Sequence, residues 1–201
     1  HLNPVSVVAT ALLATPKHAA DATQLADIVE RLLRLAAQAR TAPEAVATAL
    51  SGADAIAHTA RLGYLRRQTH ALGDVVMASD DAAVALTYFR NNVLHCFALP
   101  GLIACLIAQH GVIGKTKLAR LARELYVLLE SELYLPPWRT ESVASAPVAH
   151  DDGDHVNATS RGPDAVLFPP FERTLATMAN DGWIRLEAEA DVVSASPAGT
   201  D

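Results

Sequence analysis

A short pattern occurs twice in this chain and constrains the fold more than any other feature. ARLGYLR at 60–66 leads to DVVMAS at 74–79, and ANDGWIR at 179–185 leads to DVVSAS at 191–196. In each copy a glycine stands where a helix would end, and an aromatic residue opens the segment that follows. Glycine adopts the left-handed conformation that ends helices, and short apolar runs on either side of a turn indicate a β-hairpin. The sequence therefore predicts two copies of a helix followed by a β-hairpin.

Many of the other apolar residues recur with the period of a helix. The clearest stripe is made of Leu25, Ile28, Val29, Leu32 and Leu35. Their spacing places them on one face of a helix. The predicted fold class is mainly α with short β-hairpins. The two helix-plus-hairpin units resemble the helix-and-wing arrangement of winged-helix domains, so we expect a helical assembly with two winged-helix-like units.

Residues 140–165 differ from the rest of the chain, because they contain few large apolar residues and many Ser, Asp, Gly and Pro. Segments of this composition bury too little apolar surface to become ordered. The sequence therefore predicts three parts. These are a helical region at 1–139 with a hairpin at about 64–79, a flexible linker at 140–165, and a helix, β-hairpin and tail at 166–201.

The longest apolar run, residues 93–108, limits how the middle of the chain can be placed. A helix that spans a bilayer needs roughly 20 residues. This run is shorter and contains His95 and the pair Pro100-Gly101. Because proline and glycine interrupt helices, we expect two buried helices separated at Pro100-Gly101. A spanning helix is not predicted, whereas contact with a membrane surface stays open.

The candidate substrate-binding residues are Arg90, Asn91 and His95, which stand beside or inside this apolar run. Polar groups in a core need hydrogen-bond partners. One interpretation is a hydrogen-bonded network that ties this helix to its neighbours. The other is that Arg90, with Asn91 or His95, meets an anionic substrate or a domain outside this chain, because a guanidinium can bind phosphate through two parallel hydrogen bonds. Both interpretations stay open at this point.

Composition argues against a nucleic-acid-binding protein, because the net charge is −6 and the pI is about 5.7. Proteins that neutralise phosphates usually carry a basic excess. Cys96 and Cys105 are the only cysteines. Neither a C-x-x-C motif nor a secretory signal is visible, which favours a reducing compartment and two free thiols. Residue 1 is His and not Met, so the chain is expected to be a piece of a longer protein.

Two short motifs suggest ligands but lack the required context. GVIGKT at 111–116 would need a glycine in place of Gln109 to be a phosphate-binding loop. HDDGDH at 150–155 offers metal ligands but lies in the predicted linker, where no rigid surroundings orient them. Cys96 and His95 are adjacent, and adjacent residues of a helix point about 100° apart. The sequence therefore predicts no catalytic residue, no metal site and no cofactor.

The segment LTYFRNNVLHCFALPGLIA at 86–104 resembles a stretch of the bacterial glycerol-3-phosphate acyltransferases, in the region C-terminal to their catalytic domain. Four other segments agree with this resemblance in their order: 3–14, 72–79, 124–135 and 181–187. The resemblance implies an enzyme of phospholipid biosynthesis. That enzyme transfers an acyl group from acyl-CoA or acyl-carrier protein to sn-glycerol 3-phosphate, as a peripheral protein on the cytoplasmic side of the cell inner membrane.

The catalytic signature of that family, H-x-x-x-x-D, is absent from this chain. His70 precedes Asp74 with three residues between them, and His150 precedes Asp154 with the same spacing. The resemblance therefore implies a non-catalytic C-terminal fragment that supports a catalytic domain outside the chain. The expected partners are the two substrates, through that missing domain, and a membrane surface, but no nucleic acid. The alternative is a stand-alone winged-helix-like module for regulation or interaction.

Overall fold

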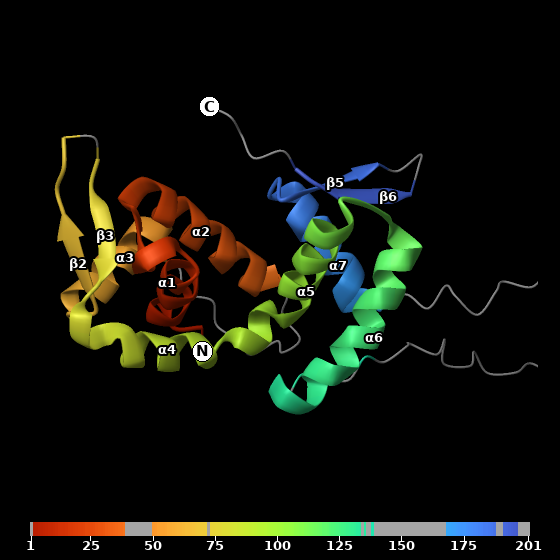
Figure 1. Cartoon of the computed structure of the whole chain (residues 1–201), viewed down its shortest axis with the longest axis horizontal. Coiled ribbons are helices and arrows are strands. Elements are labelled where there is room, and N and C mark those ends of the chain that lie inside the picture. The colour runs from red at the N-terminus through yellow and green to blue at the C-terminus, as the bar shows by residue number, and fades with distance from the viewer. Residues whose placement is uncertain are drawn as a thin grey trace, which may run out of the picture.

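The helices and strands form two units of matching architecture that lie next to each other (Figure 1). The computed structural model describes residues 2–38, 50–71, 73–133, 135, 138, 168–187 and 191–196. Within these residues helices dominate, and the strands form two antiparallel three-stranded sheets. The predicted fold class, mainly α with short β-hairpins, is confirmed.

The first unit runs from α1 to β3. Its elements are α1 (Pro4–Leu13), the 3-10 turn η1 (Pro16–His18), β1 (Ala19–Asp21), α2 (Ala22–Gln38), α3 (Gly52–Arg61), β2 (Leu65–Gln68) and β3 (Val75–Ala78). β3 lies between β1 and β2, and its Val76 faces Ala20 on one side and Arg67 on the other.

The second unit repeats this order. Its elements are α5 (Leu94–His110), β4 (Val112–Gly114), α6 (Lys115–Leu133), α7 (Pro169–Asn180), β5 (Ile184–Glu187) and β6 (Val192–Ala195). β6 is the central strand, and its buried Val193 corresponds to Val76 of the first unit. Both units thus follow the order helix, strand, helix, helix, strand, strand, which confirms the two winged-helix-like units. The strands β1 and β4 were not predicted, because three residues are too few to show a period.

The repeated sequence pattern has the same local geometry in both units. Gly63 and Gly182 have φ angles of 82° and 72°, in the left-handed region that glycine tolerates best. The chain then turns so that the backbone N–H of Ser79 donates to the carbonyl of Tyr64, at 3.1 Å. The N–H of Ser196 donates to the carbonyl of Trp183, also at 3.1 Å. The residues repeated in the sequence therefore make the same backbone hydrogen bond in both units.

The units have separate cores that share α2. The first core gathers residues of α1, α2, α3 and the β2–β3 hairpin, including Leu33. The second gathers residues of α5, α6, α7 and both hairpin strands around Phe171, and it also contains Leu35 of α2. In Figure 1 α2 extends from the first unit toward α5 and α7, and α2 and α7 are in contact. Because one helix supplies both cores, the two units are held in a fixed arrangement.

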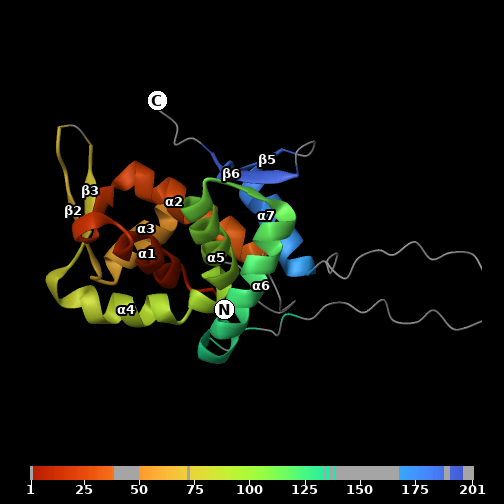
Figure 2. The same cartoon turned by 45° about the vertical axis from the view of Figure 1, so that its right-hand side comes forward.

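The helix α4 (Ala83–Asn91) connects the units after the 3-10 turn η2 (Asp80–Ala82). Its inner side packs on α1, where Leu86 is fully buried near Ala9. The ring of Phe89 meets Tyr64 edge to face, with centroids 5.4 Å apart. Its outer side leaves Val84 83% and Tyr88 65% exposed. Both views show α4 running along the edge of the molecule beneath α1 (Figures 1 and 2).

The predicted helix break at Pro100-Gly101 is wrong. Pro100 lies inside α5, which is continuous from Leu94 to His110. Because Pro100 and the adjacent Leu99 are buried in the second unit, we infer that packing outweighs the one backbone hydrogen bond that proline removes. The chain instead bends by 82° between α4 and α5, at Asn92 and Val93.

The predicted linker at 140–165 and the tail after Ser196 lie outside the described residues, so the division into three parts stays a prediction. The described residues on either side of the linker, Trp138 and Phe168, stack with ring centroids 4.1 Å apart. Both rings also contact Tyr126 of α6. The described parts of the chain before and after the linker therefore meet in the second core.

Candidate functional site

The candidate substrate-binding residues lie at the elbow between α4 and α5, defined here as residues 90–95. Arg90 and Asn91 end α4, and His95 stands in the first turn of α5. Two backbone bonds form the bend: the N–H of Val93 donates to the carbonyl of Arg90 at 3.0 Å, and the N–H of Cys96 donates to the carbonyl of Val93 at 2.9 Å. The polar run in the sequence thus marks a corner of the molecule and not the middle of a core helix.

Arg90 is bound to its own neighbour. Its Nε and Nη2 donate to Oδ1 of Asn91, at 3.2 and 3.0 Å. Arg90 as a whole residue is half-buried, its bonds to Asn91 are exposed, and Asn91 and Asn92 are exposed. Among the described residues, the side-chain hydrogen bonds found for Arg90 stay within the elbow and do not reach a neighbouring helix. The elbow therefore presents an ordered guanidinium and exposed amides at the surface.

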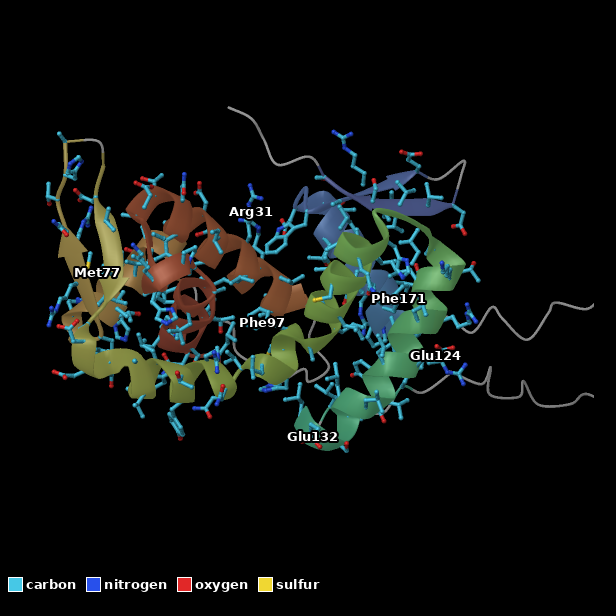
Figure 3. All side chains as sticks on the ribbon, viewed as in Figure 1. Arg31, Met77, Phe97, Glu124, Glu132 and Phe171 are labelled. Atoms are coloured by element: carbon cyan, nitrogen blue, oxygen red, sulfur yellow. The ribbon has the colours of Figure 1, made fainter. Side chains whose placement is uncertain are left out.

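A broad groove of about 630 Å³ adjoins the elbow, lined by Asn91, Leu94, His95, Glu132 and Leu133. The structure therefore brings Asn91 and His95 together, while Arg90 does not line the groove. Glu132 comes from the end of α6 (Figure 3), which packs against α5 in both ribbon views (Figures 1 and 2). No sequence pattern points to Glu132, because only the packing of α6 on α5 places it beside the elbow.

The charges of this groove decide which ligands it suits. Glu132 adds a carboxylate, which repels a phosphate group, and His95 is exposed. An amide, an imidazole and a carboxylate at the rim of an open groove are suited to hydrogen bonds with a polar protein surface. The binding of an anionic substrate by Arg90, Asn91 and His95 therefore stays a prediction.

The contact between His95 and Cys96 differs from the sequence-based expectation. Their side chains approach within 3.3 Å between Nε2 and Sγ, although adjacent helical residues were expected to point apart. Burial raises the pKa of the Cys96 thiol, and only a smaller charge effect opposes it. A thiol with a raised pKa carries less thiolate at neutral pH, and the thiolate is the nucleophile. The pair is therefore close in space but lacks the lowered pKa of an activated cysteine.

Of the two short motifs, the structure describes GVIGKT at 111–116 only. GVIGKT forms β4 and the start of α6, and Lys115 pairs with Glu172 of α7 at 2.7 Å. That lysine thus joins α6 to α7. HDDGDH at 150–155 lies outside the described residues. Within the described ranges, no three His, Cys, Asp or Glu side chains gather as metal ligands would.

Comparison with known proteins adds the family context. Residues 1–151 match the family model described as the glycerol-3-phosphate acyltransferase C-terminal region. A glycerol-3-phosphate acyltransferase of Xanthomonas axonopodis pv. citri is 38% identical over 143 residues, which are 71% of this chain and 16% of that protein. One of Pseudomonas paraeruginosa is 40% identical over 134 residues, 67% of this chain and 16% of that protein. No solved structure matches the chain.

The chain spans about one sixth of the length of these curated relatives. The matches do not favour the alternative of a stand-alone winged-helix-like regulatory module, although both units have that order of elements. The matches agree with the resemblance of residues 86–104, and of the four other segments, to the C-terminal region of this family.

Proposed function

Because this chain belongs to the glycerol-3-phosphate acyltransferase family, through its C-terminal region, we propose that it is the C-terminal part of a glycerol-3-phosphate 1-O-acyltransferase. The parent enzyme transfers an acyl group from acyl-CoA or acyl-carrier protein to sn-glycerol 3-phosphate, a step of phospholipid biosynthesis. The observation that carries this proposal is the match of residues 1–151 to the family's C-terminal region. The identity to named acyltransferases of Xanthomonas and Pseudomonas supports it.

Within that enzyme the chain is non-catalytic and supports the catalytic domain. In the H-x-x-x-x-D motif a histidine acts as the general base and the aspartate five positions later orients it. None of the histidines of this sequence has an aspartate at that position. The two units offer a rigid platform, because α2 contributes to both cores. A rigid platform can hold a neighbouring domain in its active arrangement.

The direct test compares the chain with the full-length parent enzyme. We expect residues 1–201 alone to form no acylglycerol phosphate from acyl-CoA and labelled glycerol 3-phosphate. The parent enzyme should do so, and removing this part should lower the rate. Acyl transfer by residues 1–201 alone would contradict the non-catalytic role. Full activity of the shortened parent would contradict the supporting role.

Arg90 is the residue to test for direct substrate binding. In the parent enzyme, Arg90→Ala should raise the KM for glycerol 3-phosphate if Arg90 meets the substrate, and Arg90→Lys should restore part of the affinity through its charge. A lower kcat with an unchanged KM would instead assign Arg90 to positioning the catalytic domain. Circular dichroism of the variants controls for folding.

We further propose that the parent enzyme is peripheral to the cytoplasmic side of the cell inner membrane. Among the described residues, no single helix combines the length and apolar content needed to cross a bilayer, although η2–α4 and α5 reach that length together across their 82° bend. The exposed Val84 and Tyr88 on the outer side of α4 support contact with a lipid surface.

Flotation with vesicles of bacterial polar lipids tests the membrane proposal. Residues 1–201 should float with the vesicles, and Val84→Asp should reduce the floating fraction. Val112→Asp is the matched control, because Val112 is an exposed valine on β4 of the second unit, away from α4. Equal loss of flotation in both variants, or no flotation of the unchanged chain, would contradict contact through α4.

A further inference from the structure

A row of leucines on α6 runs into the groove at the elbow. The row has spacings of four, three and four residues and ends on a glutamate: Leu121, Leu125, Leu128 and Glu132. Residues at these spacings lie on one side of a helix, and the row covers about three turns. Glu132 also lines the groove. The row and the groove therefore form one surface, which we call the α6 strip.

The α6 strip lies next to the side of α6 that packs in the second core. That buried side carries Leu118, Ala122 and Tyr126. In the strip, by contrast, Leu125 is 40% and Leu128 is 65% exposed. Single exposed leucines are ordinary, but a row of them that leads into a groove is typical of a site that binds another protein segment. The strip is therefore a candidate interaction surface.

The polar end of the strip keeps ionic and hydrogen-bonding capacity for a partner. Within the described ranges, none of the ion pairs involves Glu132. Oδ1 of Asn91 accepts from Arg90, and the exposed amide of Asn91 has two N–H donors besides. The carboxylate attracts a lysine or arginine and repels an acidic group. The strip thus suits a partner with one apolar side and a basic residue at its end.

The dimensions of the strip fit a helix. One turn of helix with its side chains fills roughly 420 Å³, as a cylinder about 10 Å wide. The groove at the polar end has a volume of about 630 Å³ and is open, so it can take one such turn. An amphipathic helix that binds in a groove uses apolar residues at spacings of three and four. The leucines of the strip offer the same spacings on the receiving side.

The start of α1 indicates which segment is nearest to the strip. α1 packs along α4, with Ala9 close to Leu86, and both views show the start of α1 next to the elbow (Figures 1 and 2). In the proposed parent enzyme, whose C-terminal region this chain matches, the preceding part is joined to the chain at this place. A tethered segment binds at a high effective concentration, so a modest contact area is sufficient.

We propose that the α6 strip is the docking site for an amphipathic helix of the parent enzyme, from the part of the same chain that precedes α1. The apolar side of that helix covers Leu125 and Leu128, and one of its lysines or arginines pairs with Glu132. This inference rests on the proposed function, in which the catalytic domain precedes this chain. A second copy of the protein and a lipid surface are the competing occupants.

Photo-crosslinking in the full-length parent enzyme identifies the occupant. With p-benzoylphenylalanine in place of Leu128, irradiation should join this position to a peptide from the part that precedes α1, which mass spectrometry identifies. The matched control has the same group in place of Val127, which is 54% exposed on the same helix but points about 100° away from Leu128. It should give little of this product. Crosslinks between two copies, no crosslinked peptide, or equal products from both positions would overturn the proposal.

Thiol labelling measures the strength of the contact. In a parent enzyme whose other cysteines are serine, Leu128→Cys should react with a maleimide at least about tenfold more slowly than the same thiol in residues 1–201 alone, because the rate follows how often the contact opens. If Leu128→Cys fails to fold, Leu125→Cys reports on the same side of α6. Equal rates in the parent and in residues 1–201 would overturn the docking.

A charge reversal tests the pairing of Glu132. In the parent enzyme, Glu132→Lys should speed the labelling of the thiol at position 128 about three- to tenfold, because a lysine there repels the basic residue of the docked helix. Glu124→Lys is the matched control, an exposed glutamate nearer the middle of α6 (Figure 3), and should leave the rate unchanged. Equal effects of the two variants would contradict the pairing.

The docking and the proposed function can fail separately, because neither crosslinking nor labelling involves acyl transfer. An active acyltransferase without the crosslink from position 128 would overturn the docking alone. A parent enzyme that forms the crosslink but transfers no acyl group would overturn the proposed activity and leave the docking in place.

Discussion

Arg34 of α2 donates from Nε to Oδ1 of Asp181, at 3.1 Å, and this bond joins the first unit to the end of α7 in the second. The Asp181 side chain is only 13% exposed, whereas Arg34 reaches it from a half-exposed position. The other carboxylate oxygen of Asp181 is buried and has no hydrogen-bond partner among the residues that the structure describes. The carboxylate therefore depends on Arg34 for its charge compensation.

We predict that Arg34→Ala lowers the free energy of unfolding by about 1.5–3 kcal/mol, the range for hydrogen bonds to charged groups. Urea denaturation followed by tryptophan fluorescence measures the change, because Trp183 lies two residues from Asp181. Arg66→Ala is the control, because its pair with Asp80 is largely exposed and should contribute less than about 1 kcal/mol. Equal effects of the two variants would contradict the importance of the inter-unit bond.

Two glycines inside helices should respond in opposite ways to alanine. Gly52→Ala places a methyl group 2.0 Å from the backbone oxygen of Ala26, which no side-chain rotation relieves. We expect a loss of about 2–3 kcal/mol in unfolding free energy. Gly101→Ala meets nothing within 4 Å in α5 and should stabilise by about 0.5–1 kcal/mol. Thermal denaturation of both variants gives the comparison, and a stable Gly52→Ala would refute the close approach of α2 and α3 at Gly52.

The two cysteines should differ in their reaction with iodoacetamide. Burial raises the pKa of Cys96, so at a given pH below that pKa it has less thiolate than an ordinary thiol and reacts more slowly. Cys105 is exposed. In the single-thiol variants Cys96→Ser and Cys105→Ser, we expect Cys105 to react at least about tenfold faster at pH 8. The difference should disappear in urea, and a difference that persisted there would not come from burial.

Tyr126 makes the folded state sensitive to alkaline pH. Burial, and then the charge of Glu130, raise its pKa from 10.0 to about 12. A folded-state pKa above the unfolded value favours folding while the phenol is protonated. This stabilising contribution is complete below pH 10 and is lost as the pH rises toward 12. Urea denaturation at several pH values should show this loss, and Tyr126→Phe should remove this part of the pH dependence.

The sequence predicted local structure better than it predicted contacts between distant segments. Gly63 and Gly182 marked the helix ends correctly, because a left-handed turn is a property of the residue itself. The bend between α4 and α5 was placed at Pro100 instead of Asn92, because burial of α5 outweighed the effect of proline on the local backbone. The sequence predicts Asn91 and His95 as candidates, but the position of Glu132 beside them depends on packing between α5 and α6.

The contact between Trp138 and Phe168 has a consequence for how this protein can vary. The two rings stack at 4.1 Å, so the chain leaves the second core and returns to it at the same place. Closing a longer flexible loop costs only about 0.6 kcal/mol for each doubling of its length. We therefore expect that inserting or removing residues between these two aromatic residues changes the stability of the second core little. The two stacked rings would then act as a clasp at the base of a site where a reporter domain can be grafted.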